Sequence, residues 1–169
     1  MSQLTHSQNP DAAIEGMEAT TQIAKDRRSC IATEVVPFGH YVVAEESLEA
    51  PYTARLPTAA ADITDGLGLG VARADTASEG LRSGNVGHAV DASFEALAEG
   101  DIWVVSEDIV PAIGTPAFVR HTAAAAPNNV LGAFRTDADT ASAVALPGAR
   151  FMRTTTAINQ LTILRVTKA

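Results

Sequence analysis

The sequence feature that most constrains the fold is the alternation of apolar and polar residues in HAVDASFEAL, residues 88–97. The even-numbered positions from 90 to 96 are apolar, and the positions between them are polar. A period of two sends successive side chains to opposite faces of a strand, so the pattern predicts a strand with one buried face. AEGD at 98–101 predicts a tight turn, and IWVVS at 102–106 predicts a returning strand. Together these segments predict a hairpin.

Further segments rich in β-branched and apolar residues predict more strands, separated by Gly- and Pro-bearing loops at spacings of about 8–15 residues. PFG at 37–39 is one such turn, and EESLEAPYTARLPTAAADITDG at 45–66 is a long polar connection. No run after residue 30 sustains a period of 3.6, so the fold class is mainly β, a sandwich or a barrel. The remaining predicted strands are 29–36, 40–44, 66–74, 117–122, 128–134, 149–154 and 161–167.

The length of 169 residues suggests one domain with an arm, and a hydrophobic content of 46% is enough for a core. We expect residues 1–28 to be an N-terminal arm, extended or partly helical, because Gly16 interrupts a weak helical spacing. A flexible terminus is the alternative. Residues 29–169 are expected to form a single β-rich domain.

Charge and composition disfavour several classes of protein. The net charge of −8 is opposite to that of a typical nucleic-acid binder, so no nucleic-acid partner is expected. No apolar run reaches the ~20 residues that span a bilayer, so no membrane partner is expected. The N-terminus lacks a signal peptide's apolar core, so we expect the chain to be made in a cytoplasm. Cys30 is the single cysteine, which excludes an internal disulfide and favours a buried, inert thiol on a strand.

Motifs that would carry a cofactor or a nucleophile are absent or incomplete. DGLGLGV at 65–71 has glycines spaced GxGxG and leads into a strand, which favours a turn and a close backbone approach over a phosphate site. The four histidines show no metal-ligand spacing, and neither GxSxG nor SxxK occurs. We therefore expect no cofactor and no metal.

The stretch GAFRTDADT at 132–140 carries the densest polar chemistry. Asp137 and Asp139, beside Arg135 and with His121 upstream, could hold a metal-bound nucleotide or act as an acid/base pair. The TDADT sequence also suits a turn in which Asp side chains accept hydrogen bonds from backbone N–H groups two residues on. We favour the structured loop, with Arg135 bracing it through an exposed ion pair and Phe134 anchoring it in the core.

Several segments resemble, in the same order, the small capsid cement proteins of tailed phages. The most specific are LGAFRTDADT at 131–140 and LPGARFMRT at 146–154; PFGHYVVA, GDIWVVSED and GTPAFVRHT are similar too. The resemblance covers most of residues 15–167. It implies a jelly-roll-like or tulip-like fold and assembly as a homodimer or homotrimer. It further implies a non-enzymatic role on the outer surface of an HK97-like head, with the major capsid protein as partner.

A cement protein acts by adding many weak contacts between neighbouring capsomers. Residues expected at capsid or subunit contacts are Leu4, Ile14 and Met17 in the arm, together with Arg120 and Arg135. Two alternatives remain open: a carbohydrate-binding β-sandwich, and a small acid/base enzyme using Asp137, Asp139 and His121.

Overall fold

A computed structural model of the 169-residue chain describes residues 13–19, 26–45, 49–74, 87–124 and 130–167. Strands dominate these segments, and the helical elements are a five-residue helix and a single 3₁₀ turn. The elements are β1 Asp26–Ala32, β2 Val36–Pro37, β3 Tyr41–Ala44, β4 Tyr52–Arg55, α1 Ala60–Thr64, β5 Gly68–Ala72, β6 Gly87–His88, β7 Ser93–Ser106, β8 Pro116–Arg120, β9 Phe134–Arg135, η1 Asp139–Ala141, β10 Ala143–Phe151 and β11 Gln160–Val166. The prediction of a mainly β fold is confirmed.

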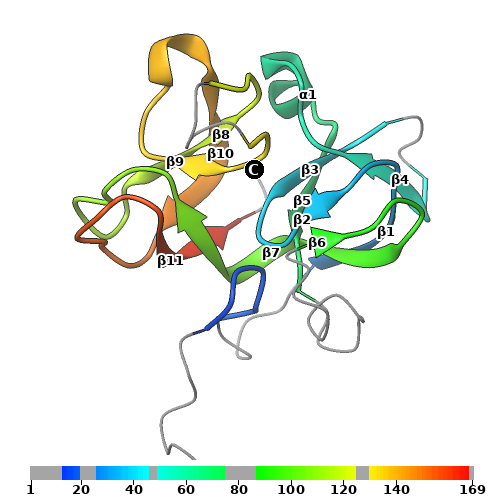
Figure 1. The fold of residues 1–169 in the computed structure, drawn as a ribbon, viewed down its shortest axis with the longest axis horizontal. Helices are drawn as coiled ribbons and strands as arrows, with labels where there is room; N and C mark the ends of the chain where they lie inside the picture. The colour runs from blue at the N-terminus through cyan, green and yellow to red at the C-terminus, as the bar shows by residue number, and fades with distance from the viewer. Residues whose placement is uncertain (1–12, 20–25, 46–48, 75–86, 125–129, 168–169) are drawn as a thin grey trace, which may run out of the picture.

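Two closed rings of strands share the long strand β7. The first ring runs β7–β1–β4–β3–β5 and returns to β7, and the second runs β7–β11–β10–β8–β9 and returns to β7. In Figure 1 the second ring occupies the left half of the molecule and the first ring the right half, with β7 crossing between them. Closure leaves each ring without a free sheet edge, which is how small barrels avoid unpaired backbone.

The predicted hairpin at 88–106 is wrong, because β7 is one continuous strand through AEGD. Its first half pairs with β1 in register Cys30↔Phe94, and its second half pairs with β11 in register Ile163↔Trp103. Gly100 has a φ of 139°, so it bends the strand where β7 passes from one ring to the other. Val90, expected on the buried face, is 52% exposed because it lies in the turn before β7.

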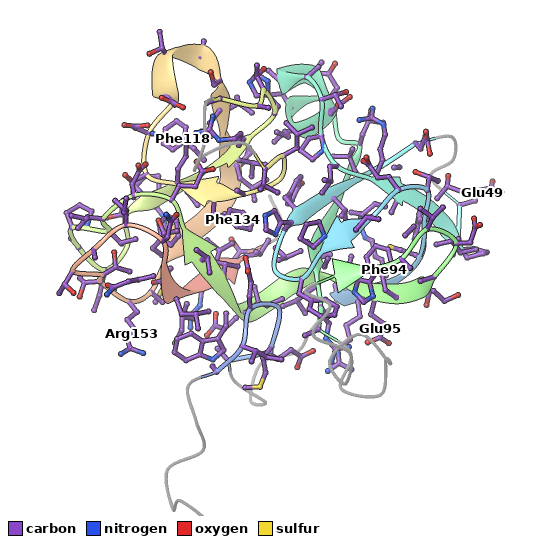
Figure 2. The ribbon with its side chains drawn as sticks, in the orientation of Figure 1. Glu49, Phe94, Glu95, Phe118, Phe134 and Arg153 are labelled. Carbon is purple, nitrogen blue, oxygen red and sulfur yellow. The ribbon has the colours of Figure 1, made fainter. Side chains whose placement is uncertain are left out.

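The core has two parts that meet at the sheet between them. One part fills the first ring around Phe94, and the other fills the second ring around Phe134 and extends onto the outer face of β3 and β5. Figure 2 labels these two phenylalanines in the right and left halves of the molecule. All four residues of β3 are buried, because Val42 faces one core while Tyr41 and Val43 face the other.

Other boundaries differ from the sequence prediction as well, and the strand predicted at 29–36 is β1, which begins at Asp26 and ends at Ala32. The connection at 45–66 contains β4 and α1, which its two prolines and polar residues had hidden. Of the strand predicted at 128–134, residues 128–129 lie outside the described residues and only Phe134 belongs to a strand, β9. The strand predicted at 149–154 begins earlier, at Ala143, and ends at Phe151.

Part of the N-terminal arm, residues 13–19, lies along β7. The Gly16 and Ala19 N–H groups donate to the carbonyls of Trp103 and Asp101, and the Trp103 N–H donates to the Met17 carbonyl. Ala74 N–H donates to the Gly16 carbonyl, so this segment also contacts the end of the first ring. Among the described residues, no helix is long and apolar enough to cross a membrane.

Candidate functional site

The polar stretch singled out in the sequence belongs to a cluster of two arginines and four carboxylates at the ends of β7, β8 and β9. Arg120 ends β8 and Arg135 ends β9, while Glu107 and Asp108 follow directly after β7. Asp137 and Asp139 come from the loop after β9. The cluster therefore joins the strand ends where the second ring closes.

Arg120 is the most enclosed member of the cluster, with no exposed surface. Its Nε and Nη2 donate to the two oxygens of Glu107 at 2.8–3.0 Å, and Nη2 also donates to Asp139 Oδ2 at 2.7 Å. A planar guanidinium suits a carboxylate held by two parallel hydrogen bonds. These partners raise the pKa of Arg120, with the Glu107 hydrogen bonds as the largest cause.

Arg135 braces the RTDAD loop, as predicted. Its Nη2 and Nε donate to Asp137 Oδ1 at 2.7 and 2.9 Å, and the Asp139 N–H donates to the same oxygen at 3.0 Å. The last contact is the Asp-to-backbone turn expected from the sequence, and Phe134 beneath it is fully buried. The ion pair is exposed on one side only, because the Asp137 side chain is 66% exposed whereas the Arg135 side chain is 6% exposed and also reaches Glu107 at 3.2 Å.

The backbone after Asp137 is unusual. Asp139, Thr140 and Ala141 have φ values of 41°, 53° and 72°, so three successive non-glycine residues lie in the left-handed region. Such residues persist where surrounding contacts over-determine the conformation. Here the Asp139 carboxylate is held by Arg120 and Arg135, and the Ser142 and Ala143 N–H groups donate back to Asp139 and Ala138 carbonyls.

The partners of Asp137 and His121 are those of a structured loop. The hydrogen bond from Arg135 lowers the pKa of Asp137, whereas a general base works best with a pKa near the working pH. The His121 ring contacts the Thr122 hydroxyl at 3.0 Å instead of either aspartate. In the part of the chain that the structure describes, no group of three or more His, Cys, Asp or Glu side chains is arranged to hold a metal.

The other candidates from the sequence have structural roles where they are described. Gly66 has a φ of 81° in a turn and Gly70 lies against the Leu97 backbone, so the glycine motif is the turn and close approach that was predicted. Cys30 is 1% exposed on β1, and burial raises its pKa to about 11, as expected for an inert thiol. His88 stacks on Phe94 with ring centroids 4.5 Å apart.

The predicted contact residues fall into two groups. Ile14 and Met17 are each 38% exposed on the segment beside β7, whereas Arg120 and Arg135 are engaged by the chain's own carboxylates. Leu4 lies outside the described residues. A contact role stays a prediction for all five, and the two exposed arm residues are the better placed.

The roles of Glu107 and Asp108 in this cluster were not predicted from the sequence. Their signal was the acidic pair that directly follows the apolar run IWVVS. Two acids at a strand end look like an ordinary solvated turn until the fold brings two arginines from other strands against them.

Comparisons with known proteins agree with this architecture. The family described as structural cement protein (E217 gp24/Pam3 gp6) matches residues 3–167. A chain of the solved capsid of Myoviridae phage XM1 is similar over 97% of this chain and 96% of its own length, with a TM-score of 0.71 and 13% sequence identity. No curated protein matches. The family match spans nearly the whole chain, so this protein belongs to the structural cement protein family of phages.

Proposed function

We propose that this protein is a non-enzymatic cement protein that binds the outer surface of an HK97-like capsid shell and stabilises the head by bridging neighbouring capsomers. The observation that carries the proposal is the match of the cement family over residues 3–167. The partner proposed is the major capsid protein, and the protein acts there as a homodimer or homotrimer.

The chemistry of the described residues supports a structural role. The most polar cluster binds its carboxylates internally, through Arg120 and Arg135. A cluster with this geometry fixes three strand ends, and the hydrogen bond from Arg135 lowers the pKa of Asp137. Two closed rings with a shared strand also make a rigid body, which suits a protein that links other subunits.

The direct test compares heads that carry the protein with heads assembled without it. We expect the decorated heads to retain their DNA at higher temperature and at lower salt, measured by release of a DNA-binding dye. Equal release curves for both kinds of head would remove the cement role.

A carbohydrate-binding role remains a second candidate because of one observation. Trp103 is partly exposed beside Arg153 and a row of threonines, in a hollow of about 410 Å³. Arg153 lies over the indole ring, 5.5 Å from its centroid, so it covers the face that a sugar would stack on. We therefore rank this role below the capsid role.

A further inference from the structure

One end of the molecule exposes an apolar surface made by two loops without charged residues, and the exposed Arg150 guanidinium borders it by donating to the Gly114 carbonyl at 3.0 Å. We call it the isoleucine end and define it as Ile109, Ile113 and Ile158 with the loops 109–115 and 154–159 that carry them. The three side chains are 49%, 68% and 55% exposed. Neither loop contains an Asp, Glu, Lys, Arg or His residue, although charged residues make up 19% of the chain.

The two loops form one surface because hydrogen bonds join them. The Thr155 N–H donates to the Val110 carbonyl at 3.2 Å, and the Val110 N–H donates to the Thr155 hydroxyl at 2.9 Å. The Asn159 N–H donates to the Ser106 carbonyl at 2.9 Å. In Figure 1 these green and orange-red loops make up the left extremity of the long axis.

The border of the isoleucine end has the composition of a protein interface. Loop 154–159 leads directly from Arg153, which lies over Trp103, and Thr154 and Thr156 line the hollow beside that ring. Figure 2 shows Arg153 at the lower left, on the same half of the molecule. Exposed aliphatic groups bordered by Trp, Arg and hydroxyl side chains are typical of an apolar contact with a polar rim.

We propose that the isoleucine end docks onto an apolar patch of the capsid shell. This inference rests on the proposed cement function and names the surface that performs it. The partner surface that meets the three isoleucines must be apolar, because a charged group placed directly against these side chains would lose its hydration.

The size of the surface indicates a repeated lattice as partner. Three partly exposed isoleucines with their small neighbours present on the order of a few hundred Å² of apolar surface. A stable pair of proteins buries about 800 Å² on each partner, so this surface alone does not hold a second copy of the chain. A small contact becomes effective when several linked copies engage neighbouring sites on one shell.

The test measures binding of the purified protein to heads assembled without it, by co-sedimentation over a range of concentrations. Ile113→Asp with Ile158→Asp places charge in the contact, and we expect at least tenfold weaker apparent affinity. Ile113→Ser with Ile158→Ser removes apolar area without adding charge, and should weaken binding by a smaller factor. The matched control is Val35→Asp with Val90→Asp, two valines that are 62% and 52% exposed on the first ring.

The control should bind within about twofold of the unmodified protein, and all variants should keep its unfolding midpoint and sedimentation coefficient. Normal binding by the aspartate variant, or equal loss in the control, overturns the isoleucine end as the docking surface and leaves the cement function standing. A change of oligomeric state in the aspartate variant alone assigns the surface to self-association and also overturns the inference. Failure of the unmodified protein to bind heads removes the cement function itself.

Discussion

Arg120 shows how a single residue can hold the closure of a strand ring. The guanidinium has no exposed surface and compensates Glu107, whose side chain is 7% exposed. Breaking a buried pair by removing one partner costs about 3–5 kcal/mol, because the remaining charge stays buried without compensation. Glu107 would keep its 3.2 Å contact with Arg135, so we expect Arg120→Met to lower the free energy of unfolding by at most that amount, measured by urea denaturation.

Arg150→Met is the matched control for that variant. Arg150 is exposed on β10 and makes one hydrogen bond to the Gly114 carbonyl. An exposed substitution of this kind changes stability by less than about 0.5 kcal/mol. If the two variants lose similar stability, the cluster does not contribute as the geometry indicates.

The cluster also marks how far residue-level reasoning can reach from sequence. The Asp137 turn and the Arg135 brace were predictable, because their partners lie within four residues. The partnership of Arg120 with Glu107 was not, since it depends on which strand ends meet in the closed ring. For the same reason the burial of the pair was missed.

At the scale of elements, strand β7 shows where local signals fail. AEGD has the composition of a turn, yet pairing on both sides with β1, β5, β11 and the arm keeps the strand continuous. The backbone bend is absorbed at Gly100. Most other strands were predicted from β-branched composition, whereas β4 and α1 depend on contacts with distant strands and left no periodic signal.

The close packing of β5 on β7 can be tested at the glycines of the GLGLGV motif. A Cβ on Gly70 would overlap the Leu97 backbone, whereas a Cβ on Gly66 would meet nothing within 4 Å. Both residues have positive φ, so alanine costs about 1–2 kcal/mol of backbone strain at either site. We expect Gly70→Ala to destabilise the protein by clearly more than Gly66→Ala, measured by thermal unfolding. Equal losses would mean that β5 can move away from β7 without cost.

Glu15 ties the arm segment to the body and gives it a pH dependence. Its carboxyl lies 3.6 Å from His40 Nδ1 and accepts a hydrogen bond from the Val105 N–H at 3.5 Å. Burial raises its pKa from 4.5 to about 7, so the folded state favours the protonated form. The protonated Glu15 carboxyl therefore contributes to the free energy of unfolding below pH 4.5, and this contribution is lost as the pH rises to about 7.

Glu15→Gln keeps the shape and removes this titration. We expect the variant to gain stability over the unmodified protein between pH 4.5 and about 7, by on the order of 1–3 kcal/mol. Burial lowers the pKa of His40, so the stability that depends on its neutral form is lost as the pH falls in both proteins. Urea denaturation of both proteins across this range measures the difference, and a constant difference would contradict the assignment.

At the scale of the whole molecule, the shared strand makes the two rings dependent on each other. β7 supplies one wall to each ring, and one core extends from Phe134 across to Tyr41, Val43 and Val71 of the first ring. Opening either ring therefore removes strand partners and apolar cover from the other. We expect a single cooperative unfolding transition, in which fluorescence of Trp103 and far-ultraviolet circular dichroism coincide. Native-state hydrogen exchange should give equal protection for β3 amides in one ring and β11 amides in the other, whereas two separated transitions would show that each ring folds alone.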